Sequence, residues 1–145
     1  HPEVPGGPSL KLVDWELAGW GEPLWDVGAM VGQLVFYWAV SIRPSPGEDF
    51  ATWVRNAAVP FTDVQRALAT FVEGYAAEAG RPLDGPGGCR SRIVRFAGVF
   101  LMHRALATLE AMGVMSGGAY CCLLVGKTLL SSPERSIEIL FGKAP

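Results

Sequence analysis

Apolar residues recur at helical spacing over most of the chain after residue 22. From residue 23 to about Ser41 nearly every position is apolar, which predicts a helix that lies at the centre of the fold. Pro23 suits the first helical position, where a backbone N–H is not needed. A short helix is predicted over Phe50–Ala57 after a proline- and glycine-containing loop.

The second half of the chain continues this pattern. Asp63–Ala79 carries an apolar residue every three or four positions, and Thr62 is a suitable N-cap for it. The same spacing predicts a helix over Arg90–Met112 and another over Gly117–Leu130. A last helix is predicted to begin at Pro133, with Ser132 as its N-cap, and to end near Gly142.

The first twenty residues differ from the rest. Residues 1–9 are rich in proline and glycine and predict a loop, whereas Leu10–Val13 alternates as a short strand does. Asp14 follows this strand, where side chains commonly point into a cleft. The sequence therefore predicts a mostly α-helical protein with one small β-hairpin and no β-α-β alternation.

Composition limits the classes of function. The chain has 145 residues, half of them hydrophobic, and a net charge of -2, which fits one globular domain and argues against nucleic-acid binding. The cysteines, Cys89, Cys121 and Cys122, form no disulfide framework or zinc spacing and are expected to be idle thiols in the cytoplasm. The apolar stretch Gly28–Val40 is too short to span a membrane.

A carboxylate at the end of a strand is a hard oxygen ligand that suits Mg²⁺, although an aspartate there can also simply cap a turn. The context of Asp14 favours the metal. The run VDWELAGWGEPLWD, residues 13–26, resembles the metal-binding segment of the aminoglycoside phosphotransferase and choline kinase-like family, whose members are related to protein kinases. Its single departure is Glu22, where the family usually has aspartate.

The resemblance implies a role for each acid. Asp14 would bind the Mg²⁺ that bridges the phosphates of ATP. Asp26, on a helix expected to be buried, would accept hydrogen bonds from backbone N–H groups of the catalytic loop, because an unpaired buried charge is costly. Glu16 is a candidate for contact with the substrate or a second metal, and Trp20 and Trp25 are candidates for lining the acceptor pocket. The alternatives are a solvent-facing acid and, for Trp20 and Trp25, aromatic core packing.

The first residues, His1, Pro2, Glu3 and Val4, resemble the second half of the family's catalytic loop. The catalytic aspartate would precede His1, so the chain as written contains no catalytic residue. Val4 stands where a metal-binding asparagine is usual. Residues 1–20 are thus interpreted as a remnant of the catalytic loop and metal-binding segment and 21–145 as the helical subdomain, with the ATP-binding N-terminal lobe absent.

By this resemblance the chain is the C-terminal lobe of an ATP- and Mg²⁺-dependent phosphotransferase that acts on a hydroxyl of a small molecule such as an aminoglycoside, another antibiotic or a choline-like alcohol. The region after Asp49 would border the acceptor site. One alternative is a peptide Ser/Thr kinase of the same family. Another is a non-catalytic binding module that pairs with a missing lobe or partner chain, and the last is a plain structural domain.

Two other features have weaker functional interpretations. Arg90, Arg92 and Arg95 cluster at the start of a predicted helix and are either a site for an anion or, as we expect, a solvated face. His103 has no serine or aspartate pattern beside it and is expected to be a packed or surface histidine.

Overall fold

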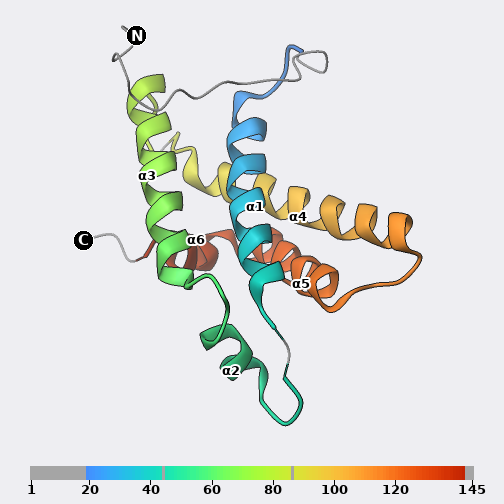
Figure 1. Ribbon diagram of the computed structural model, residues 1–145. Coiled ribbons are helices and arrows are strands. Elements are labelled where there is room, and N and C mark those ends of the chain that lie inside the picture. Colours follow the sequence, from blue (N-terminus) through green and yellow to red (C-terminus); the bar gives the residue numbers. More distant parts are fainter. Residues whose placement is uncertain (1–18, 44, 86, 143–145) are drawn as a thin grey trace, which may run out of the picture.

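The computed structural model describes residues 19–43, 45–85 and 87–142, and this part of the chain consists of helices joined by loops, with no strand (Figure 1). Its helices are α1 (Pro23–Ser41), α2 (Phe50–Arg55), α3 (Phe61–Ala79), α4 (Arg90–Met112), α5 (Gly117–Ser131) and α6 (Pro133–Phe141). The prediction of a mostly α-helical protein is confirmed. The expected strand at residues 10–13 and its hairpin lie outside the described residues.

Most helix boundaries agree with the sequence pattern. The predicted bounds of α1 and α4 are those observed, and the ends of α2 and α5 differ from prediction by no more than two residues. Ser132 is the N-cap of α6, as expected, but its hydroxyl makes no capping hydrogen bond. No helix in the described ranges combines the length and apolar character that a membrane span requires.

The start of α3 differs from the prediction. Thr62 is inside the helix, and Pro60 occupies the cap position without a side-chain hydrogen bond. The backbone carbonyl of Pro60 instead accepts a hydrogen bond from the N–H of Asp63 at 3.1 Å. The helix starts two residues earlier than predicted, and the ring of its first residue, Phe61, packs against Trp38 of α1 with 4.7 Å between ring centroids. The first residue of α3 is therefore one that makes an aromatic contact with α1, and Thr62 does not act as the N-cap.

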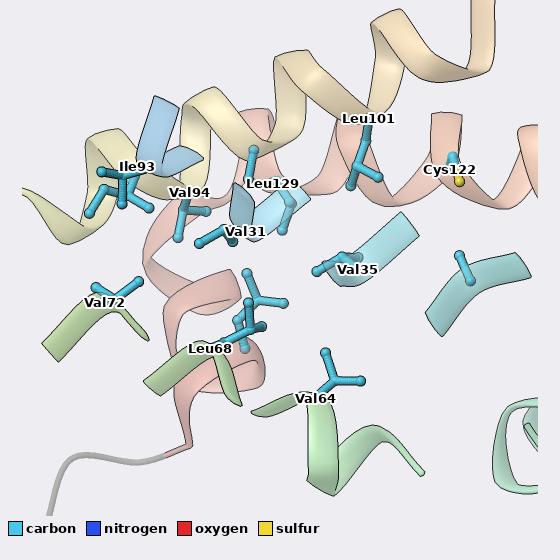
Figure 2. Packing of buried hydrophobic residues seen from close by; sticks show 14 of the residues in the cluster. Val31, Val35, Val64, Leu68, Val72, Ile93, Val94, Leu101, Cys122 and Leu129 are labelled. Carbon is cyan, nitrogen blue, oxygen red and sulfur yellow. The ribbon is translucent and has the colours of Figure 1, made fainter. Parts of the chain in front are cut away.

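α1 lies at the centre of the core. It contacts α3, α4 and α5, and α4 packs most extensively against α1 and α5 (Figure 1). Figure 2 shows apolar side chains from these helices converging on one cluster, with Val31 and Val35 contributed by α1. The buried positions of α1 recur every three or four residues, as an amphipathic helix requires: Leu24, Val27, Val31, Val35 and Ala39.

Glycines bring α4 close to both of its neighbours. A Cβ added at Gly98 of α4 would lie 2.9 Å from the backbone oxygen of Gly126 in α5, and one added at Gly126 would lie 2.8 Å from the oxygen of Gly98. On the other side, a Cβ at Gly28 of α1 would collide with the Cβ of Phe96. These helices therefore approach at a distance that any larger residue would prevent.

Candidate functional site

The residues with predicted roles fall into two groups. His1, Pro2, Glu3, Asp14 and Glu16 lie outside the described residues. The structure does place the second half of the family-like segment, where the chain enters α1: Trp20, Glu22, Trp25 and Asp26. The geometry of this entrance can therefore be compared with what the resemblance implies.

Glu22 fixes the start of α1 to the start of α4. Its carboxylate accepts a hydrogen bond from the backbone N–H of Leu24 at 3.2 Å and forms an ion pair with Arg92. The backbone hydrogen bond and the nearby Arg92 guanidinium hold the pKa of Glu22 below its ordinary value. An acid at a helix start was expected from the sequence, but its partner on a helix seventy residues away was not.

Asp26 does not lie in a buried face of α1. It is in the first turn, between the buried residues Leu24 and Val27, but its side chain is exposed. Within the described ranges its carboxylate has no hydrogen-bond or ion-pair partner. The expectation that Asp26 is buried is therefore wrong, whereas its support of the catalytic loop involves residues outside the described ranges and stays a prediction. The carboxylate remains available to N–H groups from outside the described ranges.

The tryptophans at this entrance also differ from a core pair. Trp20 is fully exposed, so the alternative of core packing is wrong for it. Trp25 is exposed on one side and packs edge-on against Phe96 of α4, with 5.6 Å between ring centroids. An exposed indole beside an exposed carboxylate gives the entrance of α1 a surface that a ligand can reach.

The arginine cluster is mostly used in structural contacts. Arg90 pairs with Asp84 at 3.2 Å and its guanidinium lies 5.3 Å from the ring centroid of Phe141, while Arg92 pairs with Glu22. Arg95 is exposed. The three side chains therefore have separate surroundings and do not form a common anion site. His103 is exposed, in agreement with a surface histidine.

A second feature lies near the other end of α1. A hollow of about 500 Å³, called the apolar cavity below, opens between α1, α2, α3, α5 and α6. A smaller hollow of about 220 Å³ adjoins it and shares Ala39, Ile42, Cys121 and Leu124. The apolar cavity is lined by Val35, Trp38, Ala39, Ile42, Val54, Phe61, Cys121, Leu124, Val125, Thr128, Leu129, Ser136, Ile139 and Leu140.

The polar atoms of this lining are already engaged or covered. The hydroxyls of Thr128 and Ser136 donate to the backbone carbonyls one turn earlier, at 2.9 and 2.8 Å. Burial raises the pKa of the Cys121 thiol, which therefore stays protonated at neutral pH. The indole nitrogen of Trp38 has no hydrogen-bond partner among the described residues, but it is buried rather than open to the cavity. The lining residues that the structure describes include no charged side chain, so the cavity suits apolar surface.

Sequence reasoning missed this cavity as a whole. It expected the region after Asp49 to border an acceptor site, and Trp53 and Val54 of α2 do line the two hollows. It did not expect α5 and α6 to face them. One signal in the sequence could have pointed to the cavity, namely large apolar residues at positions that face solvent. Leu124 and Ile139 are such residues, and each is almost half exposed at the rim.

Metal ligands do not cluster in the described ranges. No group of three histidine, cysteine, aspartate or glutamate side chains there is arranged to hold an ion. The carboxylates with the predicted metal role, Asp14 and Glu16, lie outside those ranges. The described residues thus contain no metal site in addition to the one predicted at Asp14.

Comparison with known proteins finds no protein family, no curated protein and no solved structure that matches this chain. The functional argument therefore depends on the residues and geometry described above.

Proposed function

We propose that this chain is the C-terminal helical lobe of an ATP- and Mg²⁺-dependent phosphotransferase that resembles the aminoglycoside phosphotransferase and choline kinase-like family and acts on a hydroxyl group. The observation that carries the proposal is the run at residues 13–26, in which Asp-Trp-Glu is followed by Gly-Glu-Pro and Trp-Asp. A pattern of mixed residue types over this length is more specific than a bare Asp-Trp-Glu.

The geometry of the α1 entrance supports this proposal. Glu22, in the Gly-Glu-Pro element, caps α1 and pairs with Arg92, so the segment that follows the predicted metal ligand is attached to α4. Asp26 presents an exposed carboxylate one turn further on. A charged acceptor in that position can take hydrogen bonds from the backbone of a neighbouring loop, which is the role that the resemblance implies.

Each residue of the family-like segment has a separate role in this proposal. Asp14 holds Mg²⁺, which supplies neutralisation of the phosphate charge during transfer. Asp26 is a positioning residue that orients the catalytic loop, of which His1, Pro2 and Glu3 are the remnant. Glu16 and Trp20 are the candidates for contact with the acceptor, and full exposure of Trp20 is compatible with that role.

The position of α2 bears on where the acceptor binds. Thirteen residues of α1 separate Asp26 from Ala39, and at 1.5 Å per residue this is about 20 Å along the helix. α2 follows the far end of α1 (Figure 1). An acceptor held by α2 alone would lie far from a phosphoryl group transferred beside Asp26. We therefore place the acceptor near Trp20 rather than at the helix after Asp49.

A second function, a non-catalytic module of the same lobe, is favoured by two observations. Val4 stands where a metal-binding asparagine is usual and cannot ligate Mg²⁺. The outer side of α1 also exposes large apolar side chains, among them Met30, Tyr37 and Val40, which a further lobe or chain would cover. Such a module would pair with a partner and would not transfer phosphate.

The test is Asp14→Asn in the complete gene product, with Asp63→Asn as a matched control. Asp63 is an exposed acid on α3 that pairs with Arg66. We expect phosphate transfer from ATP to fall by roughly a hundredfold or more in Asp14→Asn, because metal charge stabilisation is lost, and to be unchanged in the control. Circular dichroism should show the same helix content in both variants.

Calorimetry separates the two functions. Titration of the wild-type gene product with ATP, with and without Mg²⁺, should give a metal-dependent heat that Asp14→Asn lacks. Unchanged turnover in Asp14→Asn would disprove the metal role. Absence of any metal-dependent heat in the wild type would favour the non-catalytic module.

A further inference from the structure

The apolar cavity is too large to be a packing defect of the usual kind. Protein interiors contain few voids larger than a water molecule, and lining atoms that face a void lose their dispersion contacts. At about 500 Å³, the cavity instead falls in the range of about 300–1,000 Å³ that is typical of small-molecule pockets. Its floor is formed by buried residues, including Val35 and Leu140, and its rim by the exposed Leu124 and Ile139.

Water is a poor occupant of this cavity. An ordered water needs two to four polar partners, roughly, and apolar cavities of about 150 Å³ stay dry and take up benzene or xenon. The hydroxyls of Thr128 and Ser136 already donate to the backbone. With no charged lining residue and the Trp38 nitrogen covered, few groups remain to hold water in place.

A partner helix is also a poor occupant. An α-helix is about 10–12 Å wide with its side chains and rises about 5.4 Å per turn, so a single turn occupies roughly 500 Å³. The whole apolar cavity has about that volume. A helix-binding groove accepts several turns, whereas this space is surrounded by residues from α1, α2, α3, α5 and α6. The dimensions and the apolar lining therefore fit a compact small molecule.

We propose that the apolar cavity binds an uncharged, largely apolar small molecule at the end of α1 opposite Asp26. Burial of apolar surface provides the affinity, and the absence of a charged lining residue excludes ions, whose desolvation would not be compensated. This site is independent of the proposed phosphotransferase activity, and its test involves neither ATP nor Mg²⁺.

Two fluorescent probes with the same ring skeleton test the proposal. N-phenyl-1-naphthylamine is uncharged, and 1-anilinonaphthalene-8-sulfonate is the same molecule with one sulfonate. Titration of the whole chain should show saturable binding of one uncharged probe per chain, tighter than the sulfonate by about tenfold or more. Equal or tighter binding of the sulfonate, or binding that does not saturate, would overturn the proposal.

Substitution of Cys121 locates the probe. This residue lines both hollows, so Cys121→Phe should fill the space and weaken binding of the uncharged probe by about tenfold or more. Cys121→Ala, which leaves the space open, should bind the probe within about twofold of the wild type. Unaltered binding in a folded Cys121→Phe variant would place the probe elsewhere and overturn the proposal.

A third measurement needs no substitution and serves if Cys121→Phe does not fold. Iodoacetamide modifies thiols, and mass spectrometry of the peptides gives a separate rate for each cysteine. Cys89 is buried and outside the lining, so its rate reports opening of the whole fold. Saturating uncharged probe should lower the rate at Cys121 itself by about fivefold or more, whereas a probe bound elsewhere on the fold would slow only Cys89. An unchanged rate at Cys121 would contradict binding in the cavity.

Discussion

The two ends of α1 have opposite kinds of packing. In its first half, Gly28 and Gly32 meet α4 so closely that a Cβ would collide, and α4 meets α5 through Gly98 and Gly126. In its second half, α1 lines the apolar cavity with larger residues, among them Val35 and Trp38. The size of the side chains therefore does not determine how densely the helices around α1 pack. Small residues give close contact where two long helices cross, and larger ones leave space where residues of α1, α2 and α6 line the same cavity.

The first expected effect on stability concerns the close crossing of α4 and α5. Gly98→Ala adds a Cβ that would lie 2.9 Å from a backbone oxygen of Gly126, which cannot move away as a side-chain end can. The overpacking cost of about 1–3 kcal/mol exceeds the gain of about 0.5–1 kcal/mol in helix propensity. We expect a net loss of stability of about 1–2 kcal/mol in urea unfolding monitored by circular dichroism.

Gly74→Ala is the matched control. Gly74 lies inside α3, is exposed, and has no atom within 4 Å of an added Cβ. Only the propensity effect remains, so this variant should be more stable than the wild type by about 0.5–1 kcal/mol. The change in stability should therefore be negative for Gly98→Ala and positive for Gly74→Ala, which separates the effect of close helix contact from that of helix propensity. A neutral or stabilising Gly98→Ala would show that α4 and α5 do not approach as closely as described.

A pair of valines on α1 compares the two halves directly. Val31 and Val35 lie one turn apart on the same face and are 0 % and 1 % exposed, but only Val35 lines the apolar cavity. Val31→Ala should cost about 2–3 kcal/mol, from lost burial and a new void. Val35→Ala should cost about 1 kcal/mol less than this, since the space that it leaves joins the existing cavity and does not form a new void. Urea unfolding of both variants measures the difference, and equal losses would mean that the cavity is filled or closed in solution.

The sequence was sufficient for much of the helical frame. Pro23 and the apolar run after it predicted the bounds of α1, and apolar spacing predicted those of α4. The start of α3 was predicted less well because the capping preference of Thr62 is weaker than the packing of Phe61 against Trp38. Local preferences therefore predict where helices form, and tertiary contacts adjust their ends.

The candidate site was less predictable. Residues 23–41 are apolar nearly all round, so the sequence could not show that Asp26 faces solvent. The apolar cavity depends on how α1, α2, α5 and α6 are arranged around it, which no local pattern encodes. Val31 and Val35 illustrate this limit, because the sequence gives no sign that only Val35 lines the apolar cavity.

The smallest expected effect compares the acids that cap helices at the two ends. Glu22 caps α1 and joins it to Arg92, whereas Asp49 caps only α2, through the N–H of Thr52 at 2.7 Å. These hydrogen bonds lower the pKa of both acids in the folded state. Each carboxylate therefore stabilises the fold above its unfolded pKa, and this contribution is lost as the pH falls through the folded pKa.

Glu22→Gln should lower the thermal midpoint at pH 7. Its difference from the wild type should begin to shrink as the pH falls below the unfolded pKa of Glu22, near 4.5, and vanish once the pH is below the lower folded pKa. Asp49→Asn should change the midpoint less, because asparagine also accepts a hydrogen bond at an N-cap and α2 is only six residues long. Thermal unfolding between pH 7 and about pH 3 spans the range in which these carboxyl groups titrate. If the two variants responded alike, the pairing with Arg92 would add nothing to the capping of α1. The close packing of α1 on α4 would then rest on the glycine contacts without help from charge.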